Sequence, residues 1–248
     1  MTAEGLPELF PGARLRECHL PFGSGALSLL VLQDPLALAE AEPDTDIYWG
    51  ELWPASIALA EGLLSGDMWL PNGPEPVLEL GCGAGLASIA AARAGAGGLE
   101  VLATDREQRA LALTDLNAGR NGVAACVRTA RLDWCEPYDG KHRLILAADC
   151  LYAPGAAQPL LSFLRRALVS DPHAEARAIL VDPDRWSARD FHYQAQEAGF
   201  AVRKLRRSVP FTAGAEAKAL LPLSGPPSDA DSRGDQPLEV SFYELMRR

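Results

Sequence analysis

Val77-Leu-Glu-Leu-Gly-Cys-Gly-Ala-Gly85 is the stretch that decides the fold of this chain. Residues 77–80 are mostly apolar, which predicts a short buried strand. The glycines that follow let the backbone turn sharply and leave no Cβ between the chain and a bound ligand. The apolar, alanine-rich sequence from Leu86 to Ala96 predicts a helix. We therefore expect a strand, a glycine loop and a helix that together border a ligand site.

The pattern of this loop is E-x-G-x-G-x-G. It differs from the dinucleotide-binding pattern G-x-G-x-x-G, in which a pyrophosphate sits on the helix N-terminus. Glu79 lies just ahead of the loop, and Asp105 ends the next apolar run. An acidic rim favours a ligand with an ammonium group and a ribose over a diphosphate, and S-adenosylmethionine is such a ligand. A dehydrogenase is an alternative, against which the position of the third glycine counts.

Short apolar runs alternate with helical patterns after residue 76, which predicts an α/β fold with a doubly wound, mainly parallel sheet. We expect seven strands, at Val77–Leu80, Glu100–Thr104, Cys126–Leu132, Leu144–Ala148, Ala178–Asp182, Phe200–Arg207 and Leu238–Leu245. Helices are expected at Leu86–Ala96, Gln108–Asn117, Gln158–Leu168 and Ala188–Ala198. The last two strands can pair as a hairpin around residues 212–236, which makes the last strand antiparallel and the insert flexible.

The first 46 residues are expected to form an extension, and residues 47–248 the main domain. Two short apolar runs, Arg14–Leu20 and Ala26–Leu32, flank a Pro- and Gly-containing turn, which predicts a β-hairpin. Residues 1–12 are expected to be a loose arm, and residues 34–46 a partly ordered connection. Pro54 suits the first turn of a helix that runs to Leu64, because its missing N–H is not needed there.

The composition is that of a globular protein of 248 residues with a formal net charge of −10. This acidity argues against a broad nucleic-acid interface, which needs clustered Lys and Arg. Five scattered cysteines without a C-x-x-C pair, and four histidines, predict no metal site. We see neither a signal peptide nor an apolar run of transmembrane length, so we expect a cytoplasmic monomer without a membrane or nucleic-acid partner.

Candidate functional side chains follow the strands, where ligands bind in open α/β sheets. Asp105 can hold both ribose hydroxyls or cap the next helix. Asp133 can accept a hydrogen bond from the adenine amine, and Trp134 can stack on the adenine ring. The alternative is that Asp133 belongs to a turn and Trp134 to the core. Asp149 and Tyr152 follow the fourth strand, where the reactive methyl group is expected. The alternative is that Asp149 caps the next segment and Tyr152 packs in the core.

The chain resembles the class I, seven-β-strand, S-adenosylmethionine-dependent methyltransferases with their Rossmann-like fold. It resembles in particular the family 16 protein methyltransferases, many of which are lysine methyltransferases, and within them the branch that contains the electron transfer flavoprotein β-subunit lysine methyltransferase. The resemblance covers roughly residues 45–210. It rests on the glycine loop, Asp105, Leu-Asp-Trp at 132–134, the D-x-x-Y motif Asp149-Cys-Leu-Tyr152, and the Trp49/Trp53-Pro54 segment.

The resemblance implies a role for each of these residues. Glu79, Gly81, Gly83 and Gly85 would hold the methionine end and the adjoining ribose side of the cofactor. Asp105 would bind the ribose hydroxyls, Asp133 and Trp134 the adenine, and Trp53 would close over the cofactor. Asp149 and Tyr152 would border the acceptor channel and orient a substrate amine.

Three other functions remain open from the sequence. A small-molecule methyltransferase would use the same fold, and the D-x-x-Y motif counts modestly against it. Nucleic-acid amino-methyltransferases usually carry an N-P-P-Y-like motif, whose prolines Asp149-Cys-Leu-Tyr152 lacks. A non-catalytic cofactor-binding module would usually have lost glycines or the ribose acid.

Asp182-Pro-Asp-Arg-Trp186 is interpreted as a turn and helix start, and the basic run Arg203–Arg207 as the solvated face of an edge strand.

Overall fold

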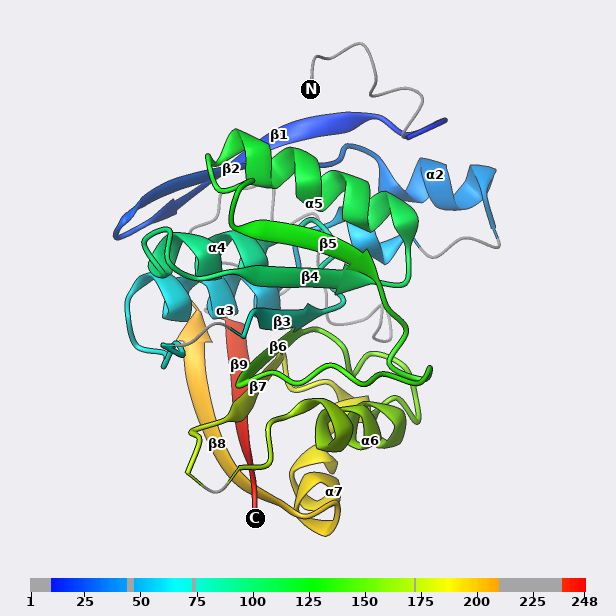
Figure 1. The fold of residues 1–248 in the computed structure, drawn as a ribbon. Coiled ribbons are helices and arrows are strands. Elements are labelled where there is room, and N and C mark those ends of the chain that lie inside the picture. Colours follow the sequence, from blue (N-terminus) through cyan, green and yellow to red (C-terminus); the bar gives the residue numbers. More distant parts are fainter. Residues whose placement is uncertain (1–9, 44–46, 73–74, 172, 210–237) are drawn as a thin grey trace.

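A seven-stranded sheet with the strand order β5-β4-β3-β6-β7-β9-β8 forms the centre of the molecule (Figure 1). The structure is a computed structural model, and it describes residues 10–43, 47–72, 75–171, 173–209 and 238–248. The strands are β3 (Val77–Leu80), β4 (Val101–Asp105), β5 (Val127–Arg131), β6 (Leu144–Ala148), β7 (Arg177–Asp182), β8 (Phe200–Val209) and β9 (Leu238–Arg247). The predicted α/β class is confirmed.

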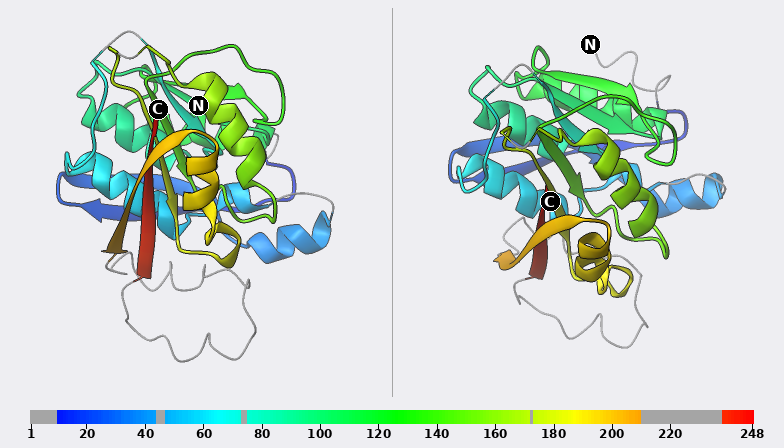
Figure 2. Two further views of the ribbon diagram at one scale, coloured as in Figure 1. Left: turned by 90° about the horizontal axis from the view of Figure 1, so that it is seen from below. Right: turned by 60° about the horizontal axis from the view of Figure 1, so that its bottom comes forward.

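The first five strands of this sheet run parallel, and β9 runs antiparallel to both β7 and β8. Figure 2 shows β8 and β9 side by side at one edge of the sheet. The predicted pairing of the last two strands is therefore confirmed, and the basic run Arg203–Arg207 lies on the edge strand, as expected. The insert at 212–236 lies outside the described residues.

Helices cover both faces of the sheet. On one face lie α3 (Pro54–Leu64), α4 (Leu86–Ala94) and α5 (Gln108–Arg120), and on the other α6 (Ala157–Ala167) and α7 (Phe191–Glu197). Side chains along β6 alternate between the two resulting cores. Leu144 and Leu146 pack with the first set of helices, and Ile145 and Ala147 with the second. A run buried on both faces is the expected pattern for a central parallel strand.

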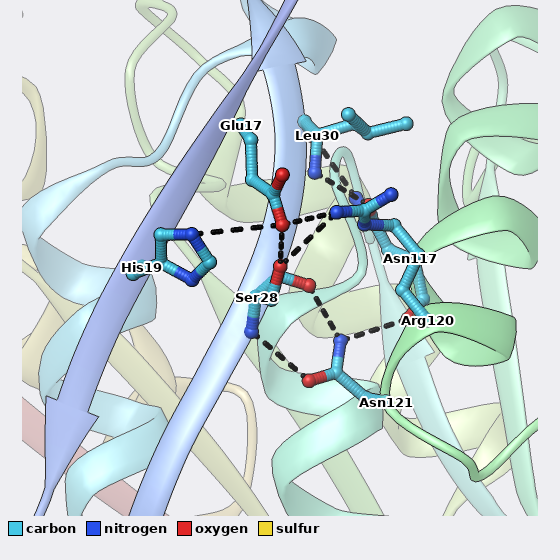
Figure 3. Close-up of polar contacts among 7 residues, drawn as sticks. All are labelled: Glu17, His19, Ser28, Leu30, Asn117, Arg120 and Asn121. Carbon is cyan, nitrogen blue, oxygen red and sulfur yellow. Dashed lines mark hydrogen bonds and ion pairs between the residues drawn. The ribbon is translucent and has the colours of Figure 1, made fainter.

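The N-terminal hairpin of β1 (Leu15–Phe22) and β2 (Gly25–Leu32) packs against α5 (Figure 1). Asn117 of α5 makes a pair of hydrogen bonds with the backbone of Leu30, at 2.7 and 3.0 Å, and Asn121 makes a similar pair with Ser28 (Figure 3). Each amide thus replaces a missing neighbouring strand for one residue of β2, because it offers both a donor and an acceptor.

The connection at 34–46, expected to be partly ordered, contains a helix, α2 (Pro35–Ala41), whose first turn is capped by Asp34. Two other local expectations were wrong. Phe10 does not belong to a loose arm: it is 1% exposed and stacks on Trp49 at 5.9 Å between ring centroids. The helix expected at Ala188–Ala198 is instead a 3₁₀ turn, η3 (Trp186–Ala188), followed by α7.

The order of the strands reverses between β3 and β6. From β3 the chain proceeds outward to β4 and β5, and then returns to the other side of β3 to form β6. Such a switch point opens a crevice beyond the C-terminal strand ends, because the two connections leave in opposite directions. None of the helices in the described part of the chain combines the length and apolar character needed to span a bilayer.

Candidate active site

A cavity of about 500 Å³ lies at this switch point. Nine of the ten side chains or glycines predicted from the sequence line it: Trp53, Glu79, Gly81, Gly83, Asp105, Asp133, Trp134, Asp149 and Tyr152. They come from segments as far apart in the sequence as Trp53 and Tyr152. The prediction that the strand ends bring these residues together therefore agrees with the geometry, whereas Gly85 is absent from the lining.

The three loop glycines all have positive φ, at 65° for Gly81, 53° for Gly83 and 82° for Gly85. Such a backbone is strained for any residue with a Cβ. Each glycine also has a close neighbour. A Cβ at Gly83 would lie 3.0 Å from the carbonyl oxygen of Trp49, and one at Gly85 would lie 2.8 Å from the Thr114 side chain. Gly85 thus allows α4 and α5 to approach closely and does not face the cavity.

Glu79 is buried and reaches from β3 to the first turn of α4. Its carboxyl group accepts from the backbone N–H of Ser88 at 2.9 Å and from the Ser88 hydroxyl. Gly85, the N-cap residue of α4, has no side chain to cap the helix, so Glu79 satisfies one of its free N–H groups from another element. Burial raises the pKa of Glu79 to about 8, although the bonds to Ser88 oppose this shift.

Asp105 ends β4 and ties the glycine loop to the start of α5. One carboxylate oxygen accepts from the N–H of Gly83 and the other from that of Glu107, each at 3.0 Å. The N-cap residue of α5 is Glu107, so Asp105 is not the helix cap that the alternative interpretation proposed. Asp133 accepts from the N–H of Cys135 at 2.9 Å, which is the turn contact expected for it, and still borders the cavity.

Aromatic side chains, among them Tyr48, Trp53 and Tyr152, form part of the cavity wall. Trp53 donates from its indole nitrogen to the carbonyl oxygen of Tyr48 at 3.0 Å. The Tyr48 ring contacts Trp53 edge-on at 5.6 Å and Tyr152 at 5.7 Å between centroids. Tyr48 and Tyr152 are 50% and 41% exposed, so they lie at the mouth of the cavity. This wall offers both ring faces and polar edges to a bound molecule.

Asp149 lies deeper and is 7% exposed. One of its oxygens accepts from the N–H of Ala55 at 3.2 Å, and the other pairs with the guanidinium of Arg185. Arg185 also lies 3.3 Å from Asp182 and stacks over Trp53, with 5.7 Å from Cζ to the ring centroid. Burial raises the pKa of Asp149 to about 6, against the opposing effect of Arg185.

Three cavity residues, Arg185, Trp186 and Glu51, were not among the site residues predicted from the sequence. Arg185 and Trp186 both line the cavity, so Asp182-Pro-Asp-Arg-Trp186 is more than the turn that its Pro and Asp residues suggested. Glu51 lines it as well, and burial raises its pKa to about 7. Its position two residues before Trp53 in Tyr48-Trp-Gly-Glu-Leu-Trp-Pro54 was the one available signal.

The residues fit S-adenosylmethionine by their shape and charge. Gly81 and Gly83 leave free the space in which side chains would otherwise stand. Six residues with carboxyl groups border the cavity and suit a cationic ligand that also carries hydroxyl groups: Glu51, Glu79, Asp105, Glu107, Asp133 and Asp149. In the ranges that the structure describes, no group of three His, Cys, Asp or Glu is arranged to hold a metal ion.

Comparisons with known proteins agree with this cofactor. A family model described as lysine methyltransferase matches residues 33–193. The electron transfer flavoprotein beta subunit lysine methyltransferase homolog of Caenorhabditis elegans is 29% identical over 67% of this chain and 72% of its own length. The electron transfer flavoprotein beta subunit lysine methyltransferase of Xenopus laevis is 34% identical over 59% of this chain and 56% of its own length.

A solved structure shares the fold. Magnesium protoporphyrin IX methyltransferase from Synechocystis, with SAH bound, superposes with a TM-score of 0.52 at 16% identity, over 78% of this chain and 83% of that one. The frog relative is matched over little more than half its length. The family match, in contrast, runs from α2 to α7 and includes all ten predicted site residues. This chain is an S-adenosylmethionine-dependent methyltransferase and belongs to the lysine methyltransferase family.

Proposed function

We propose that the protein transfers the methyl group of S-adenosylmethionine to the side-chain amine of a lysine in a protein substrate. The observation that carries this proposal is the pairing of two environments in one cavity. A glycine loop with acidic neighbours lines the cavity, and we assign it as the cofactor end. The buried carboxylate of Asp149 and the aromatic residues Trp53 and Tyr152 also line it, and we assign them as the acceptor end. The first suits a nucleoside cation, and the second suits an amine.

At the cofactor end, the chain supplies orientation. Asp105 already accepts from two backbone N–H groups, and a carboxylate has lone pairs left for ribose hydroxyls. Asp133 and Trp134 lie at the end of β5, where they would accept from the adenine amine and contact its ring. Glu79 would bind the methionine end only through the part of its carboxyl group that Ser88 leaves unused. The bound cofactor supplies an electrophilic methyl group.

At the acceptor end, the protein has to present a neutral amine. A free lysine has a pKa of about 10.4, so it must lose a proton before it attacks the methyl group. Desolvation in the cavity and the positive charge of the cofactor both lower that pKa. Asp149 and Tyr152 would orient the amine by hydrogen bonds. Positioning of this kind can supply roughly 7–11 kcal/mol in favourable cases.

The named relatives support a protein acceptor, because both carry names of lysine methyltransferases that act on a protein subunit. A formal net charge of −10 favours a basic protein partner over nucleic acid. All five cysteines are thiols and not disulfides, which suits a reducing compartment such as the cytoplasm. We infer that the enzyme acts there as a monomer.

The test uses the purified protein and a lysate of the host that lacks it. Isothermal calorimetry with S-adenosylmethionine measures cofactor binding, and methyl-labelled cofactor with peptide mapping identifies the acceptor. We expect label on lysine in one protein band. Label confined to the small-molecule fraction would instead support a small-molecule methyltransferase, and absence of cofactor binding would leave a non-catalytic module.

Asp149→Ala should abolish turnover and leave cofactor binding largely intact. The matched control is Asp139→Ala, which removes the same charge from an exposed position outside the cavity. This control should methylate at the wild-type rate. Turnover that survived Asp149→Ala would remove Asp149 from the acceptor site.

A further inference from the structure

A cation of the protein's own occupies the acceptor end of the cavity. The guanidinium of Arg185 contacts the carboxylates of both Asp149 and Asp182 and lies over the ring of Trp53. The Asp149 and Asp182 side chains are only 7% and 1% exposed, and that of Arg185 only 14%. Two buried carboxylates and an indole face form a site for a positive charge, because the low dielectric strengthens attraction and the ring adds a cation–π contact.

On the basis of the proposed function, we propose that this is the binding site for the substrate's ammonium group, which Arg185 fills in the free protein and vacates when the substrate enters. Arg185, Asp149 and Trp53 all line the cavity in which the acceptor has to lie. A lysine side chain that reached Asp149 would meet the guanidinium first. One oxygen of Asp149 is occupied by Arg185 and the other by the N–H of Ala55, and the two cations repel each other, so the substrate competes with the guanidinium for this carboxylate.

The exchange would also select for a cationic substrate side chain. Removal of one partner from a buried ion pair leaves an uncompensated charge, which is strongly unfavourable. An incoming ammonium group replaces the charge that Arg185 takes away, whereas a neutral side chain does not. The displaced Arg185 therefore discriminates against neutral side chains of similar size, before any step of methyl transfer. The bound ammonium group then gives one proton to solvent water and attacks as the neutral amine.

The backbone around Arg185 is held in place, so the movement can be confined to the side chain. The N–H of Arg185 donates to Asp182 at 2.8 Å, and the hydroxyl of Ser187 donates to the carbonyl oxygen of Leu151 at 2.5 Å. Asp184, which directly precedes Arg185, accepts a hydrogen bond from the Ser241 hydroxyl at 2.5 Å and pairs with Lys204 at 3.3 Å.

Two residues of this region have an uncommon backbone conformation. Asp149 has a φ of 57° and Asp184 a φ of 56°, in the left-handed region that favours glycine. Residues held in this way need support from their surroundings, and they are found preferentially at ligand clamps and switch regions. Asp149 is itself a member of the ion pair and follows β6, and Asp184 directly precedes Arg185 after β7.

The proposal can be tested without the natural substrate, with n-butylammonium chloride as a lysine side-chain mimic and n-butanol as a neutral mimic. Binding of both to the protein saturated with S-adenosylhomocysteine is measured by calorimetry. In the wild-type protein n-butylammonium should bind weakly, because it competes with Arg185. Arg185→Gln should bind it at least about tenfold more tightly, with no comparable gain for n-butanol. The matched control is Arg189→Gln, which removes an exposed guanidinium outside the cavity lining and should behave as the wild type.

The double variant Arg185→Gln, Asp149→Asn should lose the gain, because the carboxylate that attracts the cation is gone. A gain that persists in the double variant, or no gain in a folded Arg185→Gln, would overturn the proposal. If Arg185→Gln does not fold, the wild-type protein gives the answer through the ¹⁵Nε resonance of Arg185. This resonance should shift as n-butylammonium approaches saturation, and an unchanged resonance at saturation would overturn the exchange.

The cation exchange and the proposed function can be refuted separately. Absence of exchange in a protein that methylates lysine would refute this inference alone. A protein that exchanges the cation but transfers no methyl group to any lysate protein would refute the proposed function and leave the cation site in place.

Discussion

Glu79 accepts a hydrogen bond from the backbone N–H of Ser88 at 2.9 Å, and this contact joins the central strand to the first turn of α4. Burial raises the pKa of Glu79 from 4.5 to about 8, so the folded protein holds it protonated at a pH where the unfolded chain ionises it. Its contribution to stability is therefore complete below pH 4.5 and is lost as the pH rises towards 8.

We predict that the free energy of unfolding of the cofactor-free protein falls between pH 5 and pH 8 by up to about 4 kcal/mol through this group. Glu79→Gln mimics the protonated form and should flatten the dependence in urea titrations. Glu100→Gln, at an exposed position, should keep the wild-type slope. A Glu79→Gln profile as steep as that of the wild type would show that another group is responsible.

The glycine loop provides a second prediction, because Gly85 and Gly122 share a positive φ but differ in their surroundings. A Cβ at Gly85 would lie 2.8 Å from Thr114, whereas nothing lies within 4 Å of one at Gly122. Gly122→Ala should therefore report the backbone strain alone. Gly85→Ala should lower the free energy of unfolding by about 1–3 kcal/mol more, through overpacking. Equal losses in chemical denaturation would mean that α4 and α5 can separate without cost.

Much of the fold and site was predictable because local patterns determine them. Runs such as Leu144–Ala148, buried on both faces, indicate a central parallel strand wherever they occur. Once such strands lie parallel, the residues that follow them, including Asp105, Asp133 and Asp149, must meet at one edge. Their separation along the sequence does not affect this proximity.

The features that the sequence did not predict depend on contacts between distant segments of the chain. Arg185 follows a Pro-Asp pair that is typical of a turn, and its pairing with Asp149 arises only because β6 and β7 are neighbours. Phe10 is buried because Trp49, 39 residues away along the chain, offers it a ring. Gly85 follows the same spacing as the cavity glycines, and only the position of α5 shows that it faces Thr114 instead.

The third prediction concerns Glu51, a cavity carboxyl whose pKa burial raises to about 7. A cationic cofactor favours the ionised form, so binding of S-adenosylmethionine should tighten as the pH rises from 6 to 8. We expect a gain in affinity of about threefold to tenfold by calorimetry, and a smaller one in Glu51→Gln. Glu61→Gln, an exposed change on α3, serves as the control and corrects for titration of the cofactor itself. If Glu51→Gln and Glu61→Gln had the same pH profile, Glu51 would have no part in cofactor binding.

The final prediction tests whether the hairpin supports the cofactor site. The side chain of Asn117 bonds to Leu30 of β2 and also donates to the carbonyl oxygen of Ala84 in the glycine loop at 2.8 Å. Asn121 makes a similar pair of bonds to Ser28 but has none to the loop. Both Asn117→Ala and Asn121→Ala should destabilise the protein, the first by about 2–4 kcal/mol, because buried backbone groups lose their partners.

The two variants should differ in cofactor binding, measured by calorimetry at a temperature where both are fully folded. Asn117→Ala releases the carbonyl of Ala84, which precedes Gly85 in the loop, and should weaken S-adenosylmethionine binding by about threefold or more. Asn121→Ala should leave the affinity unchanged. Equal affinities in the two variants would mean that the glycine loop keeps its shape without the bond from Asn117, and that the hairpin contributes to stability alone.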